Sequence, residues 1–193
     1  MNVVAKHERY TVEEFLSYLD TLEGRAEYYE GEIFNMAGGS SEHGLIIANI
    51  VGELRDAMRK RPCRVYPPDV NLAIDAANTV VQPDVHVVCG EPIISNQSPK
   101  LNTNATLVVE VLSPSTYSFD RGGKFQRYRK VPNLQEYMIV EQSSYHVEVL
   151  RRQESGIWAF SSYDGLEDTV ELTSLGITLP MTMIYEKVEL AAG

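Results

Sequence analysis

The sequence predicts a mixed α/β domain in which a central β-sheet is flanked by helices. Residues 106–112 form a continuous apolar, β-branched run that only Glu110 interrupts, as expected of a strand buried on both faces. A second, largely apolar run at residues 80–88 is interrupted by Asp84. Residues 47–58 repeat apolar side chains at the spacing of an amphipathic helix. Two buried strands and such a helix together indicate helices packed on a sheet.

Length and composition are those of one globular domain. With 193 residues, 44% hydrophobic and 23% charged, we expect a single domain over residues 1–193 with its own core. No apolar run is long enough to cross a bilayer, and residues 1–8 contain no apolar signal segment. We therefore expect a cytoplasmic protein with no membrane partner. Cys63 and Cys89 fit no metal or redox spacing, which predicts two reduced thiols.

The basic residues are concentrated in two short stretches. A net charge of −10 and a pI of about 4.9 argue against a general nucleic-acid coat protein. The clusters could be solvated helix faces, but their place beside the two acid-bearing strands favours phosphate contacts. The first cluster is Arg55, Arg59, Lys60, Arg61 and Arg64, and the second is Arg121, Lys124, Arg127, Arg129 and Lys130.

The N-terminal third predicts a helix, a hairpin and a second helix. Thr11 and Glu14 have the spacing of a capping box, so a helix should run from there to about residue 19. Residues 27–36 resemble a tight hairpin around Glu30-Gly31, with acids that face either solvent or a metal. His43 lies in the first turn of the second helix. It is either a neutral capping residue or a contact for a phosphate or attacking water at the positive helix end.

The middle of the chain alternates strands with connections. We expect one strand over residues 64–75, kinked by Pro67-Pro68 and turned at residues 75–78 into an antiparallel neighbour that carries Asp84. Residues 91–104 are polar and should form a surface loop. A helix is expected over residues 119–131, despite Gly122-Gly123, with Pro132 after it.

The C-terminal third predicts mainly strands. Residues 136–140 form a short apolar strand, and residues 145–150 and 157–163 a hairpin around a glycine-containing turn. Residues 169–190 predict a strand and a short final helix.

Asp84 and Glu110 are the candidate chemical residues, because an ionised carboxylate in a buried strand needs a partner. Glu110 could pair with an arginine, or it could bind a metal ion. Two strands of one sheet that each carry one acid can bring the carboxylates together. Mg²⁺ takes a few hard oxygen ligands and keeps several waters, so the pair is also typical of metal-assisted hydrolysis.

Several motifs, in order along the chain, resemble the bacterial restriction-endonuclease family of the PD-(D/E)XK nuclease superfamily. The resemblance covers nearly the whole chain, and the ordered set is more specific than any one motif. The motifs are residues 27–32, 41–43, Pro83-Asp84, 109–116, 120–128 and 136–140.

This resemblance implies a restriction-endonuclease-like core with a central mixed sheet, a Mg²⁺-dependent phosphodiesterase that also accepts Mn²⁺, nucleic acid (DNA favoured) as substrate, and a homodimer. Asp84 and Glu110 match the metal-binding acids, and Glu27 matches the acid from the N-terminal region. The superfamily places a lysine where this sequence has Leu112. Lys124, in the following helix, matches a lysine that has moved.

The implied mechanism has Mg²⁺ held by Asp84, Glu110 and a strand carbonyl such as that of Val111, with Lys124 orienting the attacking water. Glu27 would hold a water or a second ion. The expected catalytic residues are Asp84, Glu110, Lys124 and Glu27, and the expected substrate contacts are His43, Arg121, Arg127 and Tyr128.

Two other interpretations remain open at this stage. A degenerate nuclease fold could bind nucleic acid or a protein without cleaving, which the displaced lysine favours. Alternatively, the buried acids of a structural module could be paired with arginines. For Lys124 itself, the alternative to a catalytic role is a surface pair with Asp120 on a solvated helix face.

Overall fold

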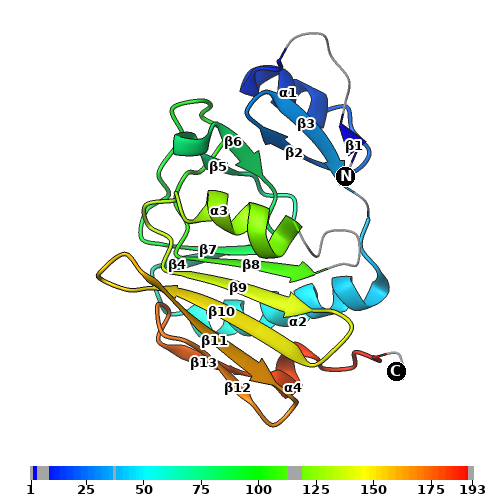
Figure 1. The fold of residues 1–193 in the computed structure, drawn as a ribbon, viewed down its shortest axis with the longest axis vertical. Coiled ribbons are helices and arrows are strands. Elements are labelled where there is room, and N and C mark those ends of the chain that lie inside the picture. The colour runs from blue at the N-terminus through cyan, green and yellow to red at the C-terminus, as the bar shows by residue number, and fades with distance from the viewer. Residues whose placement is uncertain (1, 4–8, 37, 113–118, 191–193) are drawn as a thin grey trace.

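The computed structural model describes residues 2–3, 9–36, 38–112 and 119–190, and contains two larger β-sheets and a small hairpin (Figure 1). The first sheet has the strand order β1-β3-β2-β6-β5, and the second has the order β11-β10-β9-β8-β7-β4. The two sheets are joined where β6 (Thr79–Val81) leads through Asp84 into β7 (Val85–Cys89). The prediction of a mixed sheet with flanking helices is confirmed.

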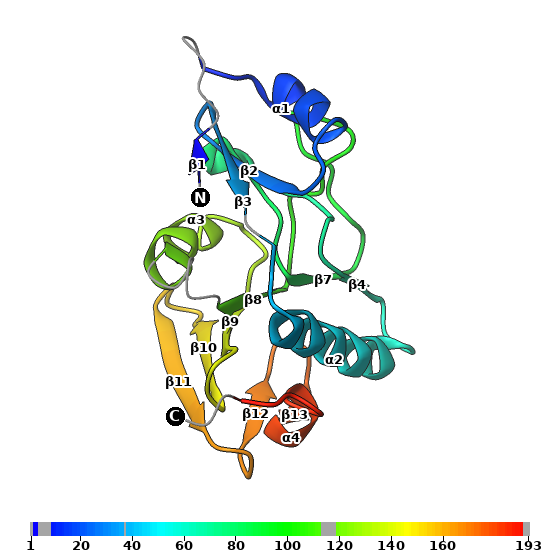
Figure 2. The same cartoon turned by 90° about the vertical axis from the view of Figure 1, so that its right-hand side faces the viewer.

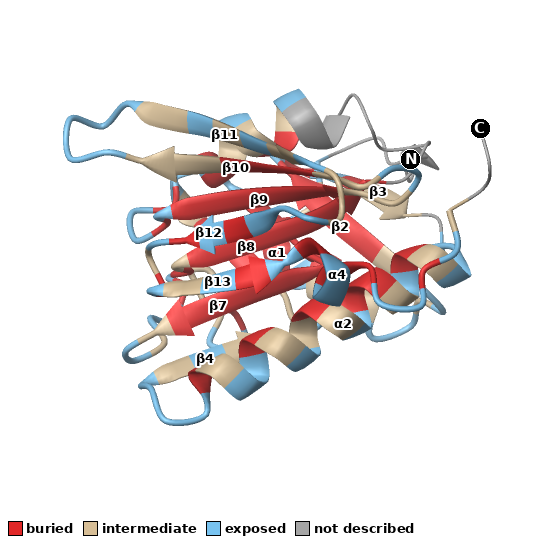
Figure 3. Ribbon diagram, turned by 90° about the horizontal axis from the view of Figure 1, so that it is seen from below, coloured by how far each residue is buried: buried red, intermediate tan, exposed pale blue. Residues whose placement is uncertain are grey.

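The six-stranded sheet contains the two acid-bearing segments. Its strands, beside β7, are β4 (Cys63–Tyr66), β8 (Leu107–Leu112), β9 (Glu136–Glu141), β10 (His146–Arg152) and β11 (Trp158–Asp164). β8 and β9 run parallel, and the other described pairs are antiparallel. All six residues of β8 are buried, as are most residues of β7 and β9 (Figure 3). A continuous apolar run therefore marked a central strand correctly.

The long helix α2 (Ser41–Met58) packs on one face of this sheet, as Figure 2 shows. Its Ile46, Ile50 and Leu54 meet Val109 and Val111 of β8 in the largest apolar cluster. The hairpin of β12 (Thr169–Leu172) and β13 (Ile177–Pro180) and the short helix α4 (Met181–Ile184) complete this layer. We expected a single strand in this last region, and the structure instead forms a hairpin.

The opposite face of the six-stranded sheet is covered by a short helical segment. It begins as the π-helix η2 (Phe119–Lys124) and continues as α3 (Phe125–Tyr128). The sequence predicted one helix to residue 131, which is too long. Gly122-Gly123 has poor helix propensity and falls within the irregular first half. Val108 and Leu112 of β8 pack on this side with Tyr128, so the side chain of Glu110 also faces α3.

The five-stranded sheet forms a separate layer with the first helix, α1 (Val12–Leu19). Thr11 caps α1 with both hydrogen bonds of the predicted capping box, and Phe15 is fully buried against Tyr28. The strands other than β6 are β1 (Asn2–Val3), β2 (Arg25–Tyr29), β3 (Glu32–Met36) and β5 (Leu72–Ile74). The predicted hairpin is β2–β3, and its turn residues Glu30 and Gly31 have positive φ values of 48° and 99°.

The strand expected over residues 64–75 is two strands in different sheets. β4 pairs with β7 of the six-stranded sheet, whereas β5 pairs with β6 of the five-stranded sheet. Pro67 and Pro68 lie between them, and proline cannot continue a β-ladder. The 3-10 turn η1 (Asp75–Ala77) then leads from β5 into β6. The strand expected over residues 80–88 is divided in the same way, into β6 and β7, with Asp84 between them. Each half pairs antiparallel with one half of the 64–75 segment, so the predicted neighbours are correct but the continuous strands are not.

The prediction of two reduced thiols is wrong. Cys63 and Cys89 form a disulfide, and the register of β4 and β7 places them directly opposite each other. Antiparallel pairing thus brings together two cysteines whose spacing in the sequence carried no signal. The bond ties the edge strand β4 to the strand that follows Asp84.

Candidate active site

Asp84 lies directly before β7, and Glu110 lies on the neighbouring strand β8. The antiparallel register pairs Val85 with Val109, so one further step places Asp84 opposite Glu110. Directly opposed residues of an antiparallel pair send their side chains to the same face of the sheet. Both side chains are buried, with residue exposures of 4% and 2%. The structure therefore brings the two acids of the sequence motif onto one face.

The carboxylate of Asp84 is held from three sides. Its Oδ1 accepts a hydrogen bond of 3.0 Å from Arg25, and its Oδ2 accepts one of 2.9 Å from the backbone N–H of Val111. His43 Nε2 lies 3.4 Å from Oδ2. Burial alone would raise the pKa of Asp84, but the hydrogen bond and charge of His43 and the charges of Arg25 and Lys124 hold it well below its usual range. Asp84 is therefore a carboxylate at neutral pH.

Lys124 lies between the two glutamates. Its Nζ is 3.1 Å from Oε1 of Glu110 and 3.3 Å from Oε1 of Glu27, and its side chain is 1% exposed. The helical segment after β8 thus sends the lysine back over the strand that carries Glu110. The alternative of a lysine on a solvated helix face is wrong, because Lys124 is buried among acids from two different sheets. The side chain of Asp120 is outside the described part of the chain.

Two tyrosine hydroxyls fix the glutamates. Tyr128 donates to Oε1 of Glu110 at 2.6 Å, and Tyr29 donates to Oε2 of Glu27. The other oxygen of Glu27 accepts from the backbone N–H of Gln82 at 3.3 Å. Burial and the neighbouring glutamates raise the pKa of both tyrosines well above the ordinary value, so the hydroxyls stay protonated and donate. We expected Tyr128 to contact substrate, but it is fully buried and its hydroxyl is used by Glu110.

His43 reaches the site from the first turn of α2. The N-cap Ser40 accepts a hydrogen bond from the backbone N–H of His43, which starts the helix at the predicted place. The ring Nε2 of His43 lies 3.1 Å from the carbonyl oxygen of Val111 and 3.4 Å from Asp84 Oδ2. His43 is therefore more than a helix cap, since it contacts two of the expected metal ligands.

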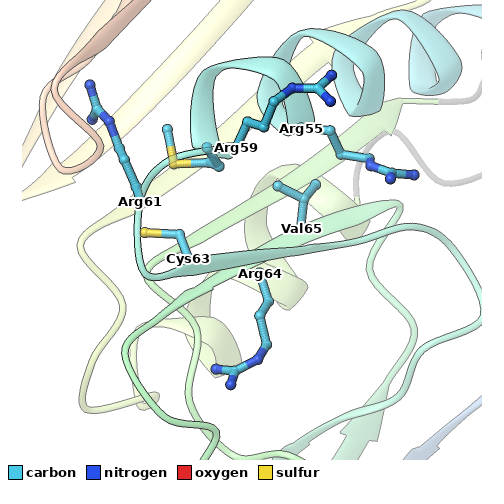
Figure 4. A pocket seen from close by; sticks show the side chains of 7 residues that line it. Arg55, Arg59, Arg61, Cys63, Arg64 and Val65 are labelled. Carbon is cyan, nitrogen blue, oxygen red and sulfur yellow. The ribbon is translucent and has the colours of Figure 1, made fainter.

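Of the described side chains in the two predicted basic clusters, only Lys124 forms an ion pair with the buried acids. Arg127 is partly exposed and stacks on the ring of Tyr29, with its guanidinium carbon 4.3 Å from the ring centre. The side chain of Arg121 is not described. In the first cluster, Arg55, Arg61 and Arg64 point in different directions around a surface pocket at the end of α2 (Figure 4).

The donor set fits a magnesium ion in kind. Asp84, Glu110 and the carbonyl of Val111 offer hard oxygens, and His43 Nε2 lies 3.4 Å from the Asp84 carboxylate and 3.1 Å from that carbonyl. Mg²⁺ needs only a few such oxygen ligands because it keeps several waters. The acids are nevertheless occupied by cationic side chains. Within the described residues, no group of three or more His, Cys, Asp or Glu side chains is arranged to hold a metal ion.

Sequence reasoning missed Arg25, Tyr29 and the backbone of Gln82. Arg25 begins β2, two residues before Glu27, so its side chain lies on the same face of the hairpin as that acid. Tyr29 follows the same alternation. The alternation of a strand places residues 25, 27 and 29 on one face of β2, and this could be read from the sequence. Whether that face of β2 points toward Asp84 depends on how the two sheets pack.

Comparisons with known proteins identify the family of the chain and agree with its fold. Residues 12–182 match the model of the Uma2 family, described as "Putative restriction endonuclease". In Synechocystis sp. (strain ATCC 27184 / PCC 6803 / Kazusa), the "Uncharacterized protein slr1290" is 32% identical over 173 residues, which cover 90% of each chain. From the same organism, the "Uncharacterized protein sll1609" is 31% identical over 177 residues, covering 92% of this chain and all of that protein.

A solved structure has the same fold. The crystal structure of a "putative nuclease belonging to DUF820" from Anabaena variabilis superimposes with a TM-score of 0.72 and 18% identity, over 91% of this chain and 97% of the other. The two proteins therefore share one fold. The chain belongs to the Uma2 family, whose model matches residues 12–182.

Proposed function

We propose that this protein is a metal-dependent endonuclease that hydrolyses phosphodiester bonds in nucleic acid, with DNA as the favoured substrate. The observation that carries this proposal is Lys124, buried between Glu27 and Glu110 on the face that Asp84 shares. A lysine beside an acid pair is the combination that the nuclease resemblance implies. Here the lysine comes from the helical segment after β8, because the strand position where the superfamily has its lysine is Leu112.

Each side chain has a task that follows from its contacts. Asp84, Glu110 and the Val111 carbonyl would hold Mg²⁺ or Mn²⁺. The bound ion would supply Lewis acidity toward a phosphoryl oxygen and increase the acidity of a nearby water. Lys124 carries a positive charge where negative charge develops during the reaction. Glu27 keeps that charge in place, because its oxygens are used by Lys124, Tyr29 and the Gln82 N–H.

The substrate would be positioned by groups at the edge of the acid cluster. His43 lies at the N-terminal end of α2, where the helix dipole favours a phosphate. Arg127 on Tyr29 places a second positive charge near Glu27. A homodimer and a cytoplasmic location remain predictions. No helix in the described residues combines the length and apolar character needed to cross a membrane.

The rival function is a nuclease fold that binds without cleaving, and one observation favours it. Arg25 pairs with Asp84 at 3.0 Å, so this acid already has a cationic partner. If the protein only binds, neither wild type nor Asp84→Asn should cleave nucleic acid, and both should bind it equally well.

Incubation of the purified chain with supercoiled plasmid and with single-stranded RNA separates the two functions. We expect plasmid nicking with Mg²⁺ or Mn²⁺, none with a chelator, and none for Asp84→Asn or Lys124→Ala. The matched control is the exposed Glu154→Gln, which should cut like wild type. Cleavage by Asp84→Asn at the wild-type rate would exclude this site as the source of the activity, and binding without any metal-dependent cleavage would support the rival.

A further inference from the structure

Arg25 has a position that the proposed reaction does not use. It begins β2 of the five-stranded sheet, and its NH1 reaches Asp84 Oδ1 at 3.0 Å. Its NH2 donates to the backbone carbonyl of Gln82. Its Nε is buried without a hydrogen bond in the described structure, and the carboxylate of Asp69 is 3.9 Å away. The guanidinium is thus held against Asp84 by its contacts with the Asp84 carboxylate and the Gln82 carbonyl.

The charges of the buried cluster nearly cancel. Glu27, Asp84 and Glu110 contribute three negative charges, and Arg25 and Lys124 contribute two positive ones, while His43 beside Asp84 adds a positive charge only when it is protonated. A cluster with three uncompensated carboxylates would bind a divalent cation tightly, because the ion would relieve their mutual repulsion. With Arg25 present, the attraction is smaller by one full charge.

Arg25 also takes up room on the carboxylate itself. A carboxylate offers about four lone-pair sites. At Asp84, Arg25 uses one, the Val111 N–H uses a second, and His43 faces the oxygen that the N–H also contacts. A metal ion that binds Asp84 must therefore share the group with a guanidinium and is repelled by its charge.

We propose that Arg25 is an internal counter-ion that competes with the divalent cation for Asp84 and thereby keeps the metal affinity of the site low. This inference rests on the metal site of the proposed function. It makes Arg25 a residue that sets metal affinity through Asp84, without contact with the nucleic acid.

Mn²⁺ binding to the full chain, measured without nucleic acid by electron paramagnetic resonance of free Mn²⁺, tests the proposal. Arg25→Gln removes the charge and keeps a hydrogen-bond donor, so we expect binding roughly tenfold tighter than in wild type. Arg25→Lys keeps the charge and should bind like wild type. Asp84→Asn should lose the binding. Arg25→Gln that binds Mn²⁺ equally or more weakly would show that Arg25 positions Asp84 instead, and would overturn the proposal.

A second measurement uses wild-type protein and does not depend on the folding of a variant. If Mg²⁺ competes with Arg25 for Asp84, titration with Mg²⁺ should shift the Nε–Hε cross-peak of Arg25 in a ¹H–¹⁵N spectrum, with the cross-peak of the exposed Arg59 unchanged. An unmoved Arg25 signal at saturating Mg²⁺ would overturn the inference, as would Mn²⁺ binding by neither wild type nor Arg25→Gln. Wild type that binds Mn²⁺ but cuts no nucleic acid would reject the proposed function and leave this inference standing.

Discussion

Lys124 Nζ lies 3.1 Å from Glu110 Oε1, although the two residues are 14 positions apart and belong to different elements. The contact forms because β8 ends close to the helical segment that packs back on its own face of the sheet. The lysine is therefore an integral part of the acid cluster, and its removal has consequences for both stability and turnover.

Replacement of Lys124 by Ala should lower stability as well as cleavage. It leaves Glu27 and Glu110 buried without their shared cation, and breaking such a pair costs about 3 kcal/mol or more. Chemical denaturation measures this loss. In the double variant Lys124→Met, Glu27→Gln, much of the stability should return while cleavage stays absent. Wild-type turnover by Lys124→Ala would remove the lysine from the mechanism.

Tyr128→Phe should loosen Glu110 without creating a cavity. The hydroxyl donates to Glu110 at 2.6 Å in a fully buried setting, and a hydrogen bond to a charged group contributes about 1.5–3 kcal/mol. We expect a lower melting temperature and a clear drop in the turnover number. The control is Tyr145→Phe, a partly buried tyrosine that packs on Tyr185 away from the acids. Equal activity of the two variants would mean that the Tyr128 hydroxyl does not position Glu110.

His86 should make the protein less stable as the pH falls. It is fully buried, its ring nitrogens have no hydrogen-bond partner in the described structure, and burial lowers its pKa from 6.5 to about 4. Between pH 6.5 and pH 4, the His86 ring is protonated in the unfolded chain but still neutral in the folded one. The free energy of unfolding is therefore unaffected by His86 above pH 6.5 and decreases as the pH falls toward 4. The full loss is about 3 kcal/mol.

His86→Phe tests this pH dependence, since a phenyl ring can keep the stacking on Tyr66. Urea unfolding at a series of pH values from 7.5 to 4 should show a shallower decline for the variant than for wild type. Parallel curves for the two proteins would mean that His86 is protonated in the folded state or that other groups dominate this range.

The Cys63–Cys89 bond should stabilise the fold measurably. It closes a loop with a sequence separation of 26, for which the chain-entropy estimate is about 3 kcal/mol. A reductant should lower the melting temperature of wild type and leave that of the Cys63→Ala, Cys89→Ala double variant unchanged. Titration of two free thiols in the folded, unreduced protein would contradict the bond.

The local elements could be predicted from the sequence, because each has a short-range cause. The capping box at Thr11, the apolar run of β8 and the hairpin turn at Gly31 act within a few residues. The helix predicted to residue 131 was too long for a local reason, Gly122-Gly123, but the larger errors involve pairing over long range. The split at Pro67-Pro68 and the disulfide both depend on which strand lies beside which.

The candidate site follows the same division. Asp84 and Glu110 could be named because an acid in an apolar run is unusual by itself, and Lys124 could be named because it matches a motif of the nuclease family. Arg25 could not, since an arginine at the start of a hairpin strand is ordinary until Asp84 is known to lie 3.0 Å away. The partners of the buried charges are a property of how the two sheets pack.

The split of the acid cluster between two sheets affects how the protein acquires its site during synthesis. Glu27 emerges from the ribosome first, Asp84 and Glu110 much later, and Lys124 only when nearly two-thirds of the chain has been made. No early folding unit contains the complete set, and β8 must also wait for its parallel neighbour β9 before it is an interior strand. A nascent or truncated chain therefore lacks the assembled charges, so the chemistry becomes available only when folding is nearly finished.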